Sequence, residues 1–179
     1  MTSTQLPGKS SLSVPLTVAC QLTRLVVTAW FIWVLVFFTI FWSDEHQVLH
    51  IFSELSGRAL GPISRFQQAA GYLVSLVNIL ILAAFVVKVW QLIAYYIAGH
   101  IFDRQAVSTF RAIAYLAIVL YVADLVDRTI TFAIVSNGGF TFWFNFYDVM
   151  HGAWALCLVM VAEVFSAGAA IAEEYSQIV

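Results

Sequence analysis

Charged side chains inside long apolar stretches are the residues of this sequence best suited to chemistry. Asp124, Asp127 and Arg128 lie in one such stretch, and Asp124 precedes Arg128 by four residues. An acid and a base at this spacing share one face of a helix, which predicts an ion pair within that helix. A second interpretation is a polar cluster that includes Asn78, at similar depth on another helix. Such a cluster could bind an ion or carry protons.

Lys88 and Glu163 form a second candidate set in two further apolar stretches. A charge in the hydrocarbon region is costly unless it is paired or hydrated, so each of these residues is a functional hypothesis. The lysine chain can reach Glu163, or it can extend to the lipid headgroups instead. Glu163 is the stronger candidate because its shorter chain has less access to water. Small residues at four-residue spacing beside it favour a packing role, and these are Ala162, Ser166 and Ala170.

Histidines offer only weak candidates for a metal or a haem. His46, His50 and Glu54 follow one another at steps of four, which places three possible ligands on one helix face. A solvated helix face explains the same pattern. His100 and His151 are expected on opposite sides of the membrane, so paired axial haem ligands are missing. Two cysteines are also too few for a thiolate metal site. We therefore expect no metal and no cofactor.

Four long apolar stretches must position these side chains. Hydrophobic residues make up 62% of the 179 residues and charged residues 10%, against about 45–50% and 25% in soluble proteins. About 20 apolar residues of helix cross a bilayer core, and continuous runs indicate helices rather than barrel strands. The sequence predicts an all-α membrane protein with four transmembrane helices in one bundle. The expected spans are residues 22–42, 72–98, 109–135 and 150–172, in a domain 21–179 that follows a disordered cytoplasmic head, 1–20.

The connection between the first two spans predicts an additional short helix. Val48, Phe52, Leu55 and Ala59 fall on one helical face, opposite the polar residues of the same segment. An apolar face of this kind is typical of an amphipathic helix that lies along the membrane interface.

The short connection between the second and third spans is a candidate partner surface. Asp103 is placed to cap the amides of the following helix, and Phe102 with Val107 fits a hydrophobic staple. Arg104 and Arg111 then follow at the start of the third helix. We expect Asp103, Arg104 and Arg111 to contribute to an inner face that a partner could bind.

Positive charge near the span ends predicts the orientation. With four spans, both termini and the 2–3 connection share one side. That side collects five basic residues against three on the other, and these are Lys9, Arg24, Lys88, Arg104 and Arg111 against Arg58, Arg65 and Arg128. We therefore expect a multi-pass membrane protein with both termini in the cytoplasm.

Two segments resemble those of a known family. Residues Ala98–Val107 and Phe110–Tyr115 are similar to the pattern G-x-x-F-[ST]-x-x-x-[VA]-x-x-[LF]-R-x-[IL]-[GA] of a bacterial four-helix membrane family, domain of unknown function 2975. Asp103 departs from it, since Ser or Thr is usual there. Ala162–Glu174 resembles the closing helix of the family, whereas residues 175–179 differ from its usual end. The resemblance covers the chain from about residue 70 onward. It implies a fold and a location in the bacterial inner membrane, and weakly a cytoplasmic protein partner.

The sequence lacks the motifs of the common hydrolases and nucleotide-binding proteins. A net charge of −2 gives no basis for direct nucleic-acid binding. We expect a non-enzymatic regulatory or interaction protein in the lipid bilayer, acting with a cytoplasmic regulator or another membrane subunit. The alternative is a small transporter, channel or immunity-type protein that uses the intramembrane charges. That alternative requires a homo-oligomer, because four helices leave little room for a pore. An enzyme acting on lipid ranks third.

Overall fold

The computed structural model describes residues 14–57, 59–101, 103–137 and 144–178, and these parts contain helices without strands. Four of the five helices are long and apolar enough to cross a membrane, which confirms the predicted four-span architecture. The fifth is the short helix predicted after the first span. The helices are α1 (Val14–Ser43), α2 (Glu45–Ser56), α3 (Arg65–Ile97), α4 (Arg104–Val135) and α5 (Phe146–Ile178).

The long helices extend beyond the predicted spans. α1 begins at Val14, so residues 14–20, which were assigned to the disordered head, are helical. Pro15 is compatible with this start because proline in the first helical turn costs no intrahelical hydrogen bond. The remainder of the predicted head lies outside the described residues. α3 begins at Arg65 behind a reciprocal capping box between Ser64 and Gln67. This cap explains a start well before the apolar run.

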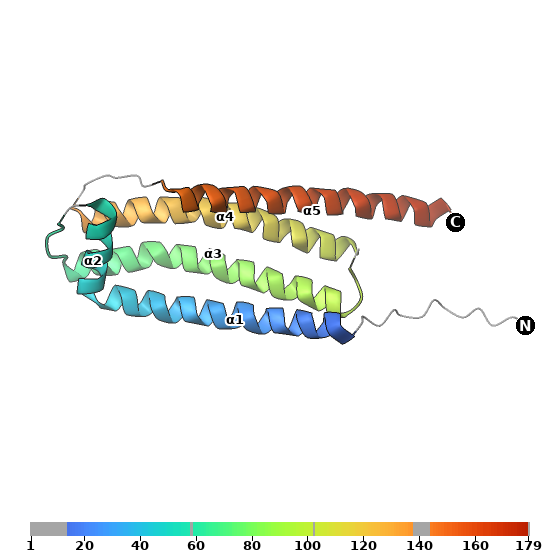
Figure 1. Cartoon of the computed structure of the whole chain (residues 1–179), viewed down its shortest axis with the longest axis horizontal. Helices are drawn as coiled ribbons and strands as arrows, with labels where there is room; N and C mark the ends of the chain where they lie inside the picture. The colour runs from blue at the N-terminus through green and yellow to red at the C-terminus, as the bar shows by residue number, and fades with distance from the viewer. Residues whose placement is uncertain (1–13, 58, 102, 138–143, 179) are drawn as a thin grey trace, which may run out of the picture.

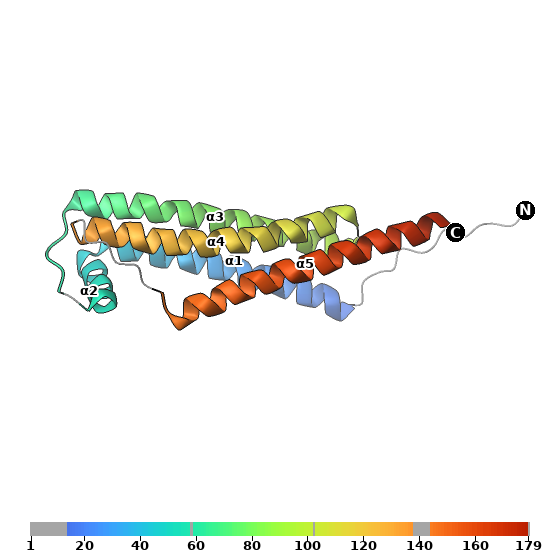
Figure 2. The same ribbon diagram turned by 90° about the horizontal axis from the view of Figure 1, so that it is seen from above.

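The four long helices lie side by side in the order α1, α3, α4, α5 (Figure 1). Each packs extensively only on its neighbours in this row, and α5 crosses α4 obliquely (Figure 2). α1 and α5 are therefore edge helices, each with one long partner. The first turn of α1 and the last turn of α5 lie at one end of the row, here called the terminal end. The opposite end carries α2 and is called the α2 end.

The main buried cluster lies at the α2 end, where α2 folds across α1, α3 and α4. Val48 is fully buried and Phe52 is 7% exposed, which confirms the amphipathic helix. The predicted face does not continue to Leu55 and Ala59, which are exposed. Leu55 lies in the last turn of α2, and Gly57 in the left-handed conformation, with φ 61°, ends the helix before Ala59. The whole cluster comprises Trp42, Val48, Phe52, Ile63, Phe132 and Val135.

Gly71 allows α1 and α3 to approach closely at this end. A Cβ atom on Gly71 would overlap the six-membered ring of Trp42, and the Trp42 residue is only 5% exposed. The indole therefore lies directly on the backbone of α3, which only a glycine permits.

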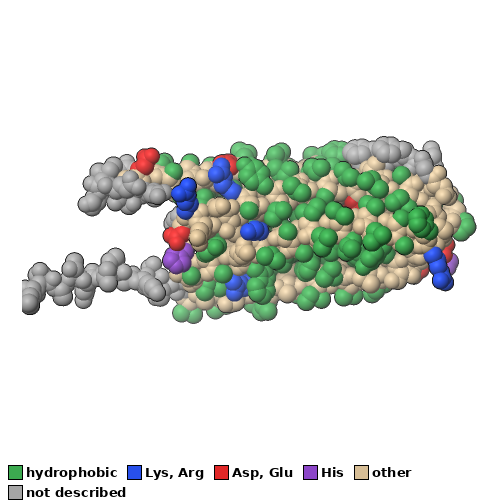
Figure 3. All heavy atoms as spheres, turned by 180° about the vertical axis from the view of Figure 1, so that it is seen from behind, with side chains coloured by type: hydrophobic (Ala, Val, Ile, Leu, Met, Phe, Trp, Pro, Cys, Tyr) green, Lys and Arg blue, Asp and Glu red, His purple; other side chains and the backbone are tan. Residues whose placement is uncertain are grey.

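Apolar side chains cover the outside of the row along most of its length, whereas charged groups gather toward its ends (Figure 3). Large residues on both edge helices are exposed, including Trp33 at 61% and Met160 at 68%. A surface of this kind is stable in contact with lipid rather than water, as expected of a multi-pass membrane protein.

Candidate functional site

An ion network with one buried carboxylate, here called the Arg128 cluster, joins α4 to α5 at the α2 end. Arg128 Nη2 donates to Asp124 Oδ2, the pair predicted within the helix, and also to Asp148 Oδ1 at 2.7 Å. Asp148 is 1% exposed and lies in the first turn of α5. Its backbone N–H donates to Asn145 Oδ1, while its Oδ2 accepts from the backbone N–H of Asn145. One carboxylate thus caps its own helix and pairs with the neighbouring helix.

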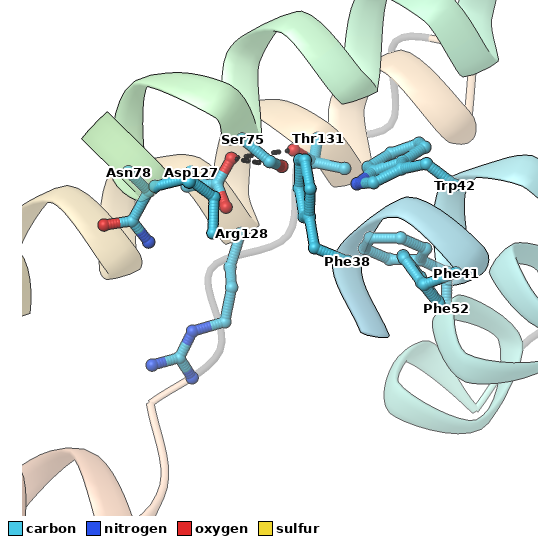
Figure 4. A pocket seen from close by; sticks show the side chains of 10 residues that line it. Phe38, Phe41, Trp42, Phe52, Ser75, Asn78, Asp127, Arg128 and Thr131 are labelled. Carbon is cyan, nitrogen blue, oxygen red and sulfur yellow. Dashed lines mark hydrogen bonds between the residues drawn. The ribbon is translucent and has the colours of Figure 1, made fainter. Parts of the chain in front are cut away.

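Asp127 lies in a different environment, although it is adjacent to Arg128 in the sequence. Its Oδ1 accepts hydrogen bonds from Ser75 Oγ at 2.8 Å and Thr131 Oγ1 at 3.2 Å. Figure 4 shows the Arg128 side chain extending away from this carboxylate. Within the described part of the chain, Asp127 makes no ion pair. The half-buried carboxylate is therefore stabilised by two hydroxyl groups without a cation.

Asp127 lines a cavity of about 180 Å³ between α1, α2, α3 and α4. We call it the Asp127 cavity. One wall is polar, and the other carries aromatic rings from α1 and α2 (Figure 4). Asn78 lines it too, and its buried Oδ1 accepts no hydrogen bond from the described residues. The aromatic wall consists of Phe38, Phe41, Trp42 and Phe52.

A second cavity, of about 450 Å³, shares Asn78 and Ile79 with the first. It is bounded by α1, α3, α4 and, through His151, by α5. Asp124 and Tyr121 also line it. Asn78 therefore lines one cavity with Asp127 and the other with Asp124, as expected if it belongs to a polar cluster with the acidic residues of α4.

At the terminal end, Glu163 pairs with Arg111 rather than with Lys88. Arg111 Nε and Nη2 donate to the two carboxylate oxygens at 3.0 and 2.6 Å, and Tyr115 adds a bond at 3.3 Å. Lys88 Nζ instead donates to Gln91 Oε1 at 3.0 Å, on its own helix. The Lys88–Glu163 contact, one of the two alternatives for Lys88, is absent because α5 packs on α4 and has no extensive contact with α3. We call Arg111, Tyr115 and Glu163 the Arg111 cluster.

Arg24 fixes α1 to α3 at the same end, a role that the sequence did not indicate. Its Nη2 donates to the carbonyl oxygen of Trp90 at 3.2 Å, and its guanidinium lies 5.1 Å from the ring centroid of Trp90. The Trp90 indole N–H in turn donates to Thr28 Oγ1 at 3.1 Å. A cation over an aromatic face is a favourable contact away from water.

The connection before α4 differs from its prediction in one contact. Asp103 occupies the N-cap position, but its side chain makes no capping hydrogen bond. It pairs instead with His100 Nδ1 at 2.7 Å. The predicted staple cannot be compared, because Phe102 lies outside the described residues. Arg104, the first residue of α4, is exposed and makes no hydrogen bond or ion pair within the described ranges.

The model of a family described as "Protein of unknown function (DUF2975)" matches residues 2–179. The chain belongs to this family. The match extends over nearly the whole DUF2975 chain, further than the resemblance seen from about residue 70 onward. No curated protein and no solved structure shows significant similarity to it.

The histidine trio of this DUF2975 protein lies on the exposed side of α2. His50 Nδ1 is 3.6 Å from Glu54, and His46 is exposed on the preceding turn. Within the residues that the structure describes, no group of three potential ligands is arranged to hold a metal ion.

Asp148 and Ser75 are the residues that sequence reasoning missed at the α2 end. Asp148 was assigned to the connection before the fourth span, yet it is the most buried acid of the structure's described residues. The sequence does contain a local indication of this role, because Asn145 followed three residues later by Asp148 is the pattern of a helix cap. Ser75 carries no comparable signal in the sequence.

Proposed function

We propose that this protein is a non-enzymatic regulatory or interaction protein of the bacterial inner membrane, with both termini in the cytoplasm. The terminal end would then face the cytoplasm and hold a protein partner. The observation that carries this proposal is Arg104, an exposed cation at the start of α4 without a partner among the described residues. The excess of basic residues on that side supports the orientation.

The chemistry of the terminal end fits recognition better than catalysis. The Arg111 cluster is saturated by its own bidentate pair and a tyrosine hydroxyl. Asp103 is paired with His100, which leaves Arg104 as the available charge of this connection. A partner with an acidic surface would complement it, and such rim charges chiefly set specificity and association rate.

Site-specific crosslinking in cells tests this proposal. A photoreactive amino acid at Arg104 should give a discrete adduct with a second protein. Arg65 is the matched control, because it is also an exposed arginine at the first residue of a long helix, but at the α2 end. Equal adducts at both positions, or none at Arg104, would contradict the proposal. A reporter enzyme fused to the C-terminus independently tests the cytoplasmic orientation.

A small transporter, channel or immunity-type protein is the second candidate. The specific observation in its favour is Asp127, a carboxylate without a cation at the wall of an intramembrane cavity. Asn78 connects this cavity to the larger one. Loss of an ion-flux or resistance phenotype in Asp127→Asn, with normal amounts of protein, would favour this function over the first.

A further inference from the structure

The Asp127 carboxylate has an unused acceptor. Both hydroxyl donors, Ser75 and Thr131, bond to Oδ1, and no described residue donates to Oδ2. Arg128 Nη2 bonds to Asp124 and Asp148, and the side chain extends away from Asp127 (Figure 4), so Arg128 is not hydrogen-bonded to this carboxylate. An ionised carboxylate removed from water is costly without a compensating charge. The arrangement therefore favours a bound cation that comes from outside the chain.

Four aromatic rings lie across the cavity from this carboxylate (Figure 4). Phe38 packs 5.0 Å from Tyr72, and Phe41 lies against Trp42 and Phe52 at 5.4 and 6.5 Å between ring centroids. The rings are thus held in place by one another. Aromatic faces attract cations, and aromatic cages of this type recognise quaternary ammonium groups.

The size of the cavity favours an organic cation over a metal ion. Its volume of about 180 Å³ exceeds the space of one ion or water, and a cavity of about 150 Å³ is known to hold benzene. A hard metal ion also needs six or so oxygen ligands at close range. Here the polar wall offers one carboxylate, two hydroxyls already directed at it, and the amide of Asn78. Arg128 also lines the cavity, but a guanidinium offers no ligand oxygen.

We propose that the Asp127 cavity binds a small organic cation, an alkyl- or arylammonium, between the Asp127 carboxylate and the aromatic wall. The unpartnered Asn78 Oδ1 adds a second oxygen, with a partial negative charge, to the lining that faces the cation. Asn78 and Ile79 also border the larger cavity, which gives the ligand a neighbouring space for its apolar substituents.

Calorimetric titration of the full-length protein in lipid nanodiscs with benzyltrimethylammonium tests this proposal. We expect saturable binding with one ligand per chain. The neutral isostere neopentylbenzene has the same shape without the charge, and it should bind at least about tenfold more weakly, one decade in Kd. Equal binding of the two compounds would show a merely apolar cavity, and no saturable binding of the cation would overturn the proposal outright.

Variants separate the two walls of the site. Asp127→Asn keeps the size and should weaken binding by about tenfold or more, and Phe38→Leu should weaken it by several-fold through loss of a cation–π contact. Glu163→Gln is the control, since it removes a paired carboxylate of the Arg111 cluster at the other end. Unchanged affinity in Asp127→Asn contradicts the proposal. If that variant does not fold, Phe38→Leu and the neutral isostere decide it.

Ligand binding to the purified chain requires no partner protein. A failed crosslink at Arg104 and a failed titration at Asp127 are therefore independent results.

Discussion

Arg111 and Arg128 are both on α4, and each bonds to a carboxylate on α5, yet the two ion pairs differ in burial. The side chain of Asp148 is 2% exposed beside Arg128, whereas both side chains of the Arg111–Glu163 pair are 43% exposed. Asp148 also caps α5 through Asn145, and its partner Arg128 bonds to Asp124 as well. The ion pair at the α2 end therefore holds α5 firmly against α4, whereas the more exposed pair at the terminal end holds it less firmly.

The inner helices α3 and α4 bury side chains at both ends, including Ile93, Ala106 and Ile113 near the terminal end. The edge helices differ more between the two ends. The buried cluster under α2 and the contact of Trp42 with Gly71 lie at the α2 end. At the other end, Gly168 on α5 faces open space where a Cβ atom would lie, so this part of the helix is not closely packed. We infer that α5 is fixed where it begins and is freer to move toward its C-terminus.

The largest expected effect comes from Asp148→Ala. The change removes the hydrogen bonds of a buried carboxylate with Arg128 and with the Asn145 N–H, while Arg128 keeps its pair with Asp124. Each lost hydrogen bond to a charged group costs about 1.5–3 kcal/mol. The variant should show a large fall in apparent melting temperature in detergent, or fail to accumulate. Glu163→Ala is the comparison at the exposed pair, and it should lower the melting temperature by much less. Equal shifts in the two variants would remove the distinction between the ends.

Gly71→Ala should have the next largest effect. The added Cβ overlaps the Trp42 ring, and overpacking of this kind costs about 1–3 kcal/mol. Gly168→Ala is the matched helical control, and it should be neutral or stabilising because alanine favours helix by about 1 kcal/mol. Thermal unfolding followed by circular dichroism measures both variants. A neutral Gly71→Ala would show that the close approach of α1 and α3 is not maintained.

Exchanging the two charges of the Arg111–Glu163 pair tests whether these residues stabilise the terminal end through an ion pair. Arg111→Glu alone places two carboxylates together on α4 and α5 and should lower stability modestly. The double variant Arg111→Glu, Glu163→Arg should recover most of that loss, which a double-mutant cycle quantifies. Absence of recovery would indicate that the bidentate geometry, rather than the charge pair, matters here.

Lys88→Gln should have the smallest effect. Because Lys88 contacts Gln91 and not Glu163, its removal should change stability by no more than about 0.5 kcal/mol. A loss of stability comparable to that of Glu163→Ala would indicate that Lys88 contacts Glu163, in contradiction to the structure.

The sequence was sufficient to predict the elements of this fold, but not the pairing of charges between different helices. Apolar run length located the four spans, and residue spacing located α2 and the Asp124–Arg128 pair. The partner of Glu163 depends on which helix α5 packs against, and neither depth nor spacing contains that information. Glu163 could pair with Lys88 on α3 or with Arg111 on α4, and the packing of α5 on α4 decides between them.

The site at Asp127 shows the same limit. Asp127 and Asn78 could be selected as polar residues in apolar helices. The separation of Asp127 from Arg128 could not be predicted, because it depends on the hydrogen bond that directs the Arg128 guanidinium to Asp148 on α5. The aromatic wall likewise requires α2 to fold back over α1, which brings Phe52 beside Phe41.

Distances from α3 to each end of α5, measured between pairs of spin labels, test the central claim most directly. One pair, at Phe66 and Val149, reports on the α2 end, and the other, at Ala94 and Ala167, reports on the terminal end, all at exposed positions. Pulsed electron-spin measurements in nanodiscs should give a narrow distribution for the first pair and a broader one for the second. Equal widths, or a broader distribution at the α2 end, would contradict the anchoring of α5 by Asp148.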